Sequence, residues 1–378
     1  MKVLFYVDTG GSTGGPGMHT VLVYRAFRAR FPEATGPFVH AESAEDHAIF
    51  ARQLGEDLVV PLGSRSLEDG SASTVVPKPG FYRALCELAR THGCDHVHVL
   101  WGFVHPSQVA EVPEAERLPL TVTLCDATGR GEDDDIDAMY FGSERWESYL
   151  REALTTRAGY LAISEKTRRD AIAKGVPEAH VETVYLWIDR ALAVHRAKTP
   201  GDYLLFVGGL ADYKGISHVL DFALLYPEYP IKVAGYPFDD FPIDFARYPS
   251  IEHLGYLERY EDVAKLIAGA RALLYLSYSE GFGLPMLEAQ LLGAPLVVNP
   301  KNRMVRELLP RGSYVSAGNL ASPSNLKAAI DVATRDRHDL VARGLENAAR
   351  FDESTLVEAT MRIIGEAHTR QRSSGLLP

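Results

Sequence analysis

The sequence predicts an α/β protein with two domains, each built on a parallel, Rossmann-like β-sheet. The chain has 378 residues, which is enough for two domains of ordinary size. Each half opens with an apolar strand, a glycine-rich loop and a helix, as a Rossmann-like unit does. Short apolar runs then alternate with helical patterns along both halves. This alternation is typical of parallel sheets covered by helices.

The first half opens on a strand at 3–7, a loop at 9–17 and a helix at 18–30. Further apolar runs predict strands at 58–60, 96–100, 121–124, 161–163 and 181–185, with a helix at 165–174. We expect these elements to form a first domain over residues 1–190.

The second half repeats the opening with a strand at 204–207, a loop at 208–215 and a helix at 216–225. Later patterns predict strands at 231–234, 272–276, 296–298 and 313–315, and helices at 260–268 and 324–334. The periodicity lapses over 188–202, where Pro200 and Gly201 break the chain. We therefore expect a second domain over 201–353, and a final helix within 354–378 that crosses back to the first domain.

Composition excludes several classes of protein. The net charge is −11, whereas a nucleic-acid partner requires clustered Lys and Arg. No apolar run approaches the roughly 18 residues of a membrane-spanning helix. The opening run reads as a strand and not as a signal peptide. The three cysteines, Cys86, Cys94 and Cys125, lack metal-ligand spacing and read as reduced thiols, so we expect a cytoplasmic protein.

A small basic cluster leaves weak peripheral membrane contact open. Arg25, Arg28 and Arg30 share one expected helix with Phe27, beside Phe31. The overall negative charge opposes binding to an anionic surface, so a solvated helix face is the favoured interpretation.

The segment 279–295 is the most informative in the chain. Glu280 and Glu288 are separated by seven residues, between two apolar strand-like runs. Pro285 and Gly293 bracket a short helix, at positions that favour each of them. Glu280 thus falls in the loop after a strand and Glu288 about one turn into the helix. Both can face the crevice at the carboxyl end of a parallel sheet, although either one alone reads more simply as a solvated surface carboxylate.

This segment resembles the Glu-x7-Glu signature of retaining glycosyltransferases of the GT-B fold, in particular the GT4-like family, glycosyl transferases group 1. The resemblance implies two Rossmann-like domains that face a central cleft. It implies that Glu288 binds the ribose hydroxyls of a nucleotide-sugar and that Glu280 binds the donor sugar. It also implies that the loop after Glu280 holds that sugar, through Gly281, Phe282, Gly283 and Leu284. An ionised carboxylate suits the first two roles because it can accept two hydrogen bonds from a vicinal diol.

Two glycine-containing loops are candidates for the donor diphosphate. In the first domain, Gly14 and Gly15 precede a helix N-terminus, where free N–H groups favour phosphate. In the second, the family usually reads Gly-Arg-Leu followed by Lys-Gly, and this chain keeps Lys214 but has Gly209 in place of the Arg. The resemblance makes Lys214 and Glu280 the catalytic candidates. Gly209 is still expected to lie among the donor-binding residues, and the absence of the family's arginine at this position could lower activity.

Two arginines could compensate for that departure. Arg303 and Arg306 follow a later strand of the same domain, and either could reach the diphosphate. Without such compensation the chain could be a pseudoenzyme.

In the first domain, Asp126 and His105 are candidate acceptor contacts, although a turn-forming Asp or a core histidine would look the same. Cys125 stands where many relatives carry a histidine, so the family's histidine contact to the donor sugar cannot be carried over to this chain. The run Asp133–Asp135 could suggest a metal site, but a solvated acidic loop is favoured. GT-B enzymes generally need no metal, so we expect no metal and no cofactor beyond the nucleotide-sugar substrate.

The combined reading is a retaining, metal-independent glycosyltransferase that moves a sugar from a nucleotide-sugar to a hydroxyl acceptor. The acceptor would be a glycan, a lipid-linked sugar or a small molecule. A sugar-nucleotide epimerase of the same fold and a non-catalytic glycosyltransferase-like partner protein are the alternatives.

Overall fold

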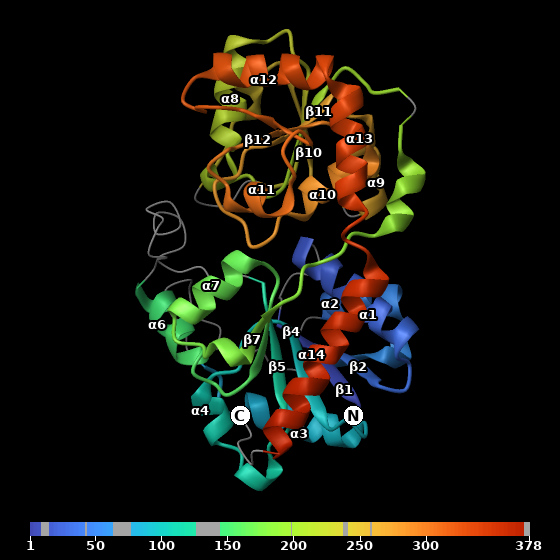
Figure 1. Cartoon of the computed structure of the whole chain (residues 1–378), viewed down its shortest axis with the longest axis vertical. Coiled ribbons are helices and arrows are strands. Elements are labelled where there is room, and N and C mark those ends of the chain that lie inside the picture. The colour runs from blue at the N-terminus through green and yellow to red at the C-terminus, as the bar shows by residue number, and fades with distance from the viewer. Residues whose placement is uncertain are drawn as a thin grey trace. The chain divides into compact units, whose positions relative to one another are not determined.

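The computed structural model describes residues 1–8, 15–41, 44–62, 77–125, 144–197, 199–236, 241–257 and 259–373 (Figure 1). The chain divides into two compact units. Unit 1 comprises Met1–Tyr185 and Glu353–Pro378, and unit 2 comprises Leu186–Asp352. The sequence predicts that the first domain ends at residue 190, but the chain leaves unit 1 at residue 185. The segment Arg190–His195 belongs to unit 2 because it packs on two helices of that unit, α9 (Tyr260–Gly269) and α10 (Leu284–Leu292).

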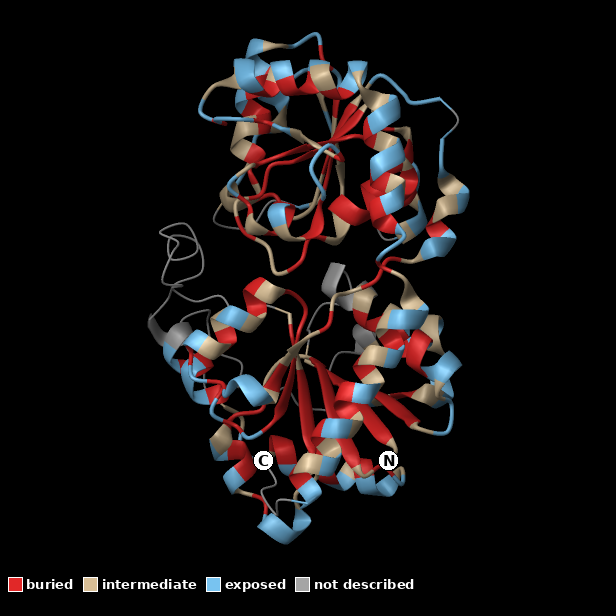
Figure 2. Ribbon diagram, viewed as in Figure 1, coloured by how far each residue is buried: buried red, intermediate tan, exposed pale blue. Residues whose placement is uncertain are grey.

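Unit 1 is a seven-stranded, all-parallel sheet with the order β3-β2-β1-β4-β5-β6-β7. Its inner strands are buried, whereas the edge strands β3 and β7 are partly exposed (Figure 2), as expected where helices cover both faces of the inner sheet. The strands are β1 (Val3–Val7), β2 (Thr35–His40), β3 (Val59–Pro61), β4 (His96–Trp101), β5 (Leu120–Leu124), β6 (Gly159–Ala162) and β7 (Val181–Thr183). The helices are α1 (Gly15–Arg30), α2 (Ala44–Leu54), α3 (Phe81–Thr91), α4 (Pro106–Ala110), α6 (Glu144–Ala153), α7 (Glu165–Ala173) and α14 (Glu353–Ser373).

The sequence prediction misses β2, which lies inside the sheet between β1 and β3. The reason is Pro37, which cannot donate to a ladder and argues against a central strand. In the structure the β1–β2 register shifts between Val3 and Phe5, so Gly36 and Pro37 stand opposite one residue of β1 and form a bulge. Gly36 is also tightly packed, because a Cβ there would lie 2.4 Å from the Cys94 sulfur.

The C-terminal helix α14 packs on β5, β6 and α1 of unit 1 (Figure 1). Gly159 makes the close approach possible, because a Cβ there would lie 2.6 Å from the Cβ of Ala367. The side chain of Gln371 accepts from the Leu120 N–H (2.8 Å) and donates to the Leu120 carbonyl (2.9 Å). These contacts tie the helix to the first residue of β5.

A chain of buried polar side chains lies beneath α14. His368 on the helix is 3.3 Å from His96, and His96 and His98 both contact the Thr121 hydroxyl at 2.8 Å. The second nitrogen of His98 lies 3.1 Å from the Thr123 hydroxyl. Burial lowers the pKa values of His96 and His368, and it lowers that of His98 from 6.5 to about 3. These imidazoles are therefore neutral near pH 7.

This burial predicts acid sensitivity of unit 1. The pKa of His98 is depressed in the folded state, so its contribution to stability is present above pH 6.5 and is lost as the pH falls below it. Between pH 7 and pH 5 the loss should be about 2 kcal/mol for His98 alone. Urea unfolding at the two pH values measures it. His98→Asn should remove that part of the pH dependence, whereas the exposed His338→Asn should not; equal slopes in all three proteins would contradict the assignment.

Unit 2 is a six-stranded parallel sheet with the order β10-β9-β8-β11-β12-β13. Helix α8 packs beside α12. Helix α10 packs beside α9 and α13. The strands are β8 (Leu204–Val207), β9 (Ile231–Ala234), β10 (Ile251–Gly255), β11 (Ala272–Tyr275), β12 (Leu296–Val298) and β13 (Val315–Ser316). The remaining helices are α8 (Ile216–Leu225), α11 (Arg303–Leu308), α12 (Pro323–Arg335) and α13 (Arg337–Ala348). The predicted parallel α/β architecture is confirmed, although the half-exposed edge strand β10 escaped prediction because its pattern is weakly apolar.

Each sheet has a point at which the strand order reverses. In unit 1 the chain proceeds from β1 to one side and returns to β4 on the other. In unit 2 the same reversal separates β8 from β11. Open α/β sheets bind ligands at this point, outside the carboxyl ends of the strands. The loops after β8 and β11 are therefore where a ligand site of unit 2 is expected.

Candidate functional site

The loops after β8 and β11 are held together by backbone contacts. The Tyr278 N–H donates to the Tyr213 carbonyl at 2.8 Å. Gly215 follows with φ 82° and lies so close to the end of β11 that a Cβ would sit 2.5 Å from the Leu276 carbonyl oxygen. Only glycine satisfies both the backbone angle and the contact. The turn that carries Lys214 is thus fixed against the loop that carries Glu280.

Lys214 and Glu280 form an ion pair across the reversal point. The Lys214 Nζ lies 2.7 Å from the Glu280 Oε2, and the two side chains are 22% and 15% exposed. The Nζ also lies 5.1 Å from the centre of the Tyr213 ring. Limited exposure makes the pair stronger than a surface ion pair. The structure therefore brings the two catalytic candidates of the sequence into direct contact.

The loop between Glu280 and α10 presents backbone donors. No hydrogen bond in the described chain uses the N–H groups of Gly281 or Gly283. Gly283 caps α10 with φ 99°, and a Cβ on it would lie 2.6 Å from the Tyr275 hydroxyl and 2.7 Å from the Met286 methyl. Free N–H groups at the start of a nine-residue helix favour an anion or the oxygens of a sugar. The buried Phe282 packs edge-to-face on Phe351, which anchors the loop.

Glu288 lies on α10, whose residues from Met286 to Leu292 are all buried. Its side chain is 5% exposed, and its carboxyl group makes no hydrogen bond within the described chain. Burial, with a smaller contribution from the Asp189 carboxylate, raises the pKa of Glu288 to about 8. A buried carboxyl without a protein partner is costly, and such groups are concentrated at functional sites. The sequence locates Glu288 but does not reveal this burial.

Gly209, the departure from the family pattern, lies in the loop after β8. Its φ is outside the left-handed region, whereas the neighbouring Gly208 has φ 138°. A side chain at 209 therefore meets no backbone obstacle of that kind. Of the two compensating candidates, Arg303 is half-buried in the first turn of α11 and Arg306 is exposed. The loop before α11 is joined to the site, because the Asn302 amide donates to the Ser277 carbonyl at 3.0 Å.

Several candidates in unit 1 lie outside the described residues, namely Gly14, Asp126 and Asp133–Asp135. Gly15 is the first residue of α1. His105 is described and buried. Its Nδ1 accepts from the Ser107 N–H and so caps α4, and its Nε2 lies 3.0 Å from the Glu152 carboxylate. Both ring nitrogens are thus used within unit 1, and His105 serves there as a structural cap.

The arginines of α1 contact unit 1 itself. Arg25 donates to the Gln53 carbonyl (2.6 Å), Arg28 donates to the Pro32 carbonyl (2.8 Å), and Arg30 pairs with Glu358 of α14. No helix in the described part of the chain is both long and apolar enough to cross a membrane. Among the described residues, no three His, Cys, Asp or Glu side chains are grouped so that they could hold a metal ion.

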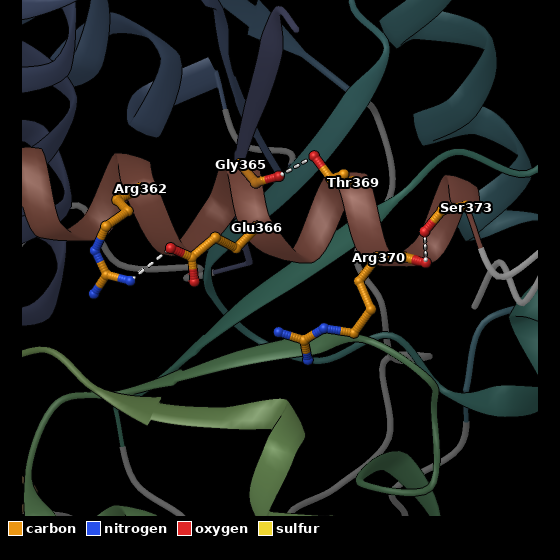
Figure 3. Close-up of a pocket in the computed structure, with 6 residues that line it drawn as sticks. All are labelled: Arg362, Gly365, Glu366, Thr369, Arg370 and Ser373. Atoms are coloured by element: carbon orange, nitrogen blue, oxygen red, sulfur yellow. Dashed lines mark hydrogen bonds and ion pairs between the residues drawn. The ribbon is translucent and has the colours of Figure 1, made fainter.

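A shallow pocket runs along α14 (Figure 3). Its lining residues all come from that helix: Arg362, Gly365, Glu366, Thr369, Arg370 and Ser373. Its charges are already satisfied, because Arg362 pairs with Glu366 (2.8 Å) and Arg370 donates to the Ala179 carbonyl. The reversal point of unit 2 is the better candidate for a functional site.

The part of the chain that carries this reversal point matches a known family. Residues 188–353 match the family model of the glycosyl transferases group 1. Part of the chain is similar to the O-antigen chain mannosyltransferase B of Escherichia coli, with 32% identity over 166 residues. The alignment covers 39% of this chain and 42% of that protein, which is less than half of each.

Solved structures match nearly the whole chain at low identity. Anabaena HepE in complex with UDP-glucose has a TM-score of 0.72 at 15% identity, covering 97% of this chain and 100% of that one. Sucrose-phosphate synthase of Thermosynechococcus elongatus has a TM-score of 0.70 at 13% identity, with 98% and 100% covered. At such identity these matches establish the fold. The chain thus has the GT-B fold, and its residues 188–353 match the family model of the glycosyl transferases group 1.

Proposed function

We propose that the protein is a retaining glycosyltransferase that moves a sugar from a nucleotide-sugar to a hydroxyl acceptor. The observation that carries this proposal is the arrangement at the carboxyl edge of the unit 2 sheet. There the Lys214–Glu280 pair and the partnerless, buried Glu288 belong to neighbouring elements. A cation, a free helix N-terminus and two carboxyl groups are the groups needed to hold a diphosphate between two diols.

The donor would lie across these groups in a fixed order. The Glu288 carboxyl would accept hydrogen bonds from the ribose hydroxyls, and Lys214 would contact the diphosphate. Glu280 and the N–H groups of Gly281 and Gly283 would hold the sugar. The 2.7 Å contact between Lys214 and Glu280 favours this order, because sugar and diphosphate are joined through a single oxygen.

In the transfer step an acceptor oxygen would bond to the anomeric carbon while the bond from that carbon to the phosphate oxygen breaks. The departing diphosphate would take both electrons of that bond, and one of its oxygens would receive the acceptor proton. Lys214 would stabilise the negative charge that grows on the diphosphate. Gly209 provides no second cation, so Lys214 would carry more of this role than in relatives with an arginine at that position.

The relatives suggest the kinds of substrate. HepE was solved with UDP-glucose and the Escherichia coli relative is a mannosyltransferase, so we propose a hexose donor and a saccharide or lipid-linked saccharide acceptor. Acceptor contacts would come mainly from unit 1, with Asp126 as a candidate, and the protein would act in the cytoplasm.

The test is a transfer assay with UDP-, GDP-, ADP- and dTDP-sugars and a panel of saccharide acceptors. We expect nucleotide release that depends on an added acceptor. We also expect an α-linked product, which proton NMR identifies from the coupling at the anomeric position. A β linkage would contradict the retaining mechanism. Conversion of the nucleotide-sugar without an acceptor would indicate an epimerase, and binding without turnover would indicate a non-catalytic partner protein.

Turnover should persist in excess EDTA. The proposed diphosphate site uses Lys214 and helix N–H groups to neutralise charge, so a divalent cation is not required there. The measurement is the initial rate with and without chelator. Loss of activity that Mn²⁺ or Mg²⁺ restores would contradict this prediction and return attention to Asp133–Asp135.

A further inference from the structure

A buried hydroxyl lies directly beneath the proposed donor site. Tyr275 is the last residue of β11 and is 6% exposed. Its hydroxyl makes no hydrogen bond of good geometry in the described chain, and it lies 2.6 Å from the place where a Gly283 Cβ would be. Other buried tyrosines use this group: the hydroxyls of Tyr82 and Tyr160 both donate to carbonyl oxygens. A buried hydroxyl left without a partner costs free energy and calls for an explanation.

The Glu280 carboxylate acts on this hydroxyl. Burial and the Glu280 carboxylate together raise the pKa of Tyr275 well above its ordinary value, so the hydroxyl keeps its proton and can donate. Within the protein, Glu280 instead receives its hydrogen bond from Lys214. The carboxylate therefore has two potential donors: Lys214 is engaged at 2.7 Å, whereas the Tyr275 hydroxyl, which acts on the same carboxylate, makes no hydrogen bond of good geometry with it.

The proposed donor site makes these two donors compete. If Lys214 turns toward the diphosphate, Glu280 loses its partner while it remains only 15% exposed. A carboxylate left in that condition would oppose donor binding, because a buried charge needs compensation. A replacement donor must then come from a group that is close, protonated and not otherwise engaged. Tyr275 meets all three conditions.

We propose that Tyr275 is a positioning residue whose hydroxyl donates to the Glu280 carboxylate when Lys214 turns to the donor diphosphate. This inference rests on the proposed function. The exchange would free the Lys214 ammonium for the leaving group and would hold Glu280 toward the sugar hydroxyls. Gly283 keeps the space above the hydroxyl open, since any side chain there would collide with it.

Tyr275→Phe tests the proposal because it removes only the oxygen. The hydroxyl makes no hydrogen bond that the fold depends on, so the variant should be at least as stable as the wild type. We expect a tenfold or greater fall in kcat, with the affinity for the free nucleoside diphosphate unchanged, since that ligand lacks the sugar. In a Glu280→Gln background the same substitution should change kcat less than about twofold, because its effect acts through Glu280.

A matched control is Tyr203→Phe. Tyr203 lies just before the amino end of β8, and its hydroxyl donates to the Leu266 carbonyl at 2.8 Å. Its loss should lower stability and leave turnover unchanged, the reverse of the result for Tyr275→Phe. Normal turnover in Tyr275→Phe, or an equal loss in both backgrounds, would overturn the positioning role while wild-type transfer stands. Absence of transfer by the wild type with any donor would overturn the proposed function, and this role with it.

Discussion

Lys214→Ala is expected to lower kcat about 10²–10³-fold, the range for removal of one well-placed electrostatic stabiliser. The donor KM should change much less, because charge on the diphosphate grows toward the transition state. The substitution also leaves Glu280 without the partner it contacts at 2.7 Å. Steady-state kinetics with the preferred donor measure both constants. The control is Lys232→Ala, which removes an ammonium that pairs with Glu252 on the neighbouring edge strand and should leave kcat unchanged.

Gly209→Arg should restore part of the activity lost in Lys214→Ala. The φ of Gly209 is not left-handed, so an arginine meets no backbone strain there. Rescue would show that the missing family cation and Lys214 act on the same charge. Near-normal turnover in Lys214→Ala would instead show that the diphosphate is held elsewhere, with Arg303 or Arg306 as the groups to change next.

Glu288→Gln should stabilise the protein while weakening nucleotide binding. The pKa of Glu288 is about 8 in the folded state against 4.5 for an ordinary carboxyl. Because the folded pKa is raised, the contribution of Glu288 to stability is fully present below pH 4.5 and is lost as the pH rises toward 8. At pH 7 this loss amounts to about 3 kcal/mol, which a neutral amide avoids. Urea unfolding across this pH range measures the difference.

The pH dependence separates this effect from a general change in packing. The stability of Glu288→Gln should match that of the wild type near pH 4.5 and exceed it increasingly up to pH 8. Glu346→Gln, on the exposed side of α13, should track the wild type throughout. If Glu288→Gln and the wild type were equally stable at every pH, the raised pKa of buried Glu288 would be contradicted. Above pH 8, where folded Glu288 is ionised, the nucleotide affinity of Glu288→Gln should be roughly tenfold or more below that of the wild type, as for the loss of a hydrogen bond to a charged group.

Much of this architecture is predictable from local sequence patterns. The strands β1, β8, β9 and β12 coincide with the predicted ranges, because each is a buried apolar run bounded by turn residues. Strand β2 is not predictable in this way, since its bulge accommodates a proline that local rules exclude. The helices α3 and α13 also escaped prediction, although both carry buried apolar faces.

The candidate site is only partly predictable for a different reason. Spacing identifies Glu280, Glu288 and Lys214 as candidates, because loops at one sheet edge follow from the strand order. Spacing cannot show that Lys214 and Glu280 touch, or that Glu288 is buried, because both depend on the packing of distant segments. Tyr275 gave no signal at all, since an aromatic residue at the end of a buried strand usually belongs to the core.

The most direct test of the account is calorimetric titration of the wild-type protein and Glu288→Gln with UDP-, GDP-, ADP- and dTDP-sugars. The account predicts saturable one-to-one binding of at least one donor by the wild type. Above pH 8, where Glu288 is ionised, it predicts that this binding is at least about tenfold weaker in Glu288→Gln and unchanged in Glu346→Gln. No binding of any donor by the wild type, or equal affinity in a folded Glu288→Gln, would contradict a nucleotide-sugar site at the reversal point of unit 2.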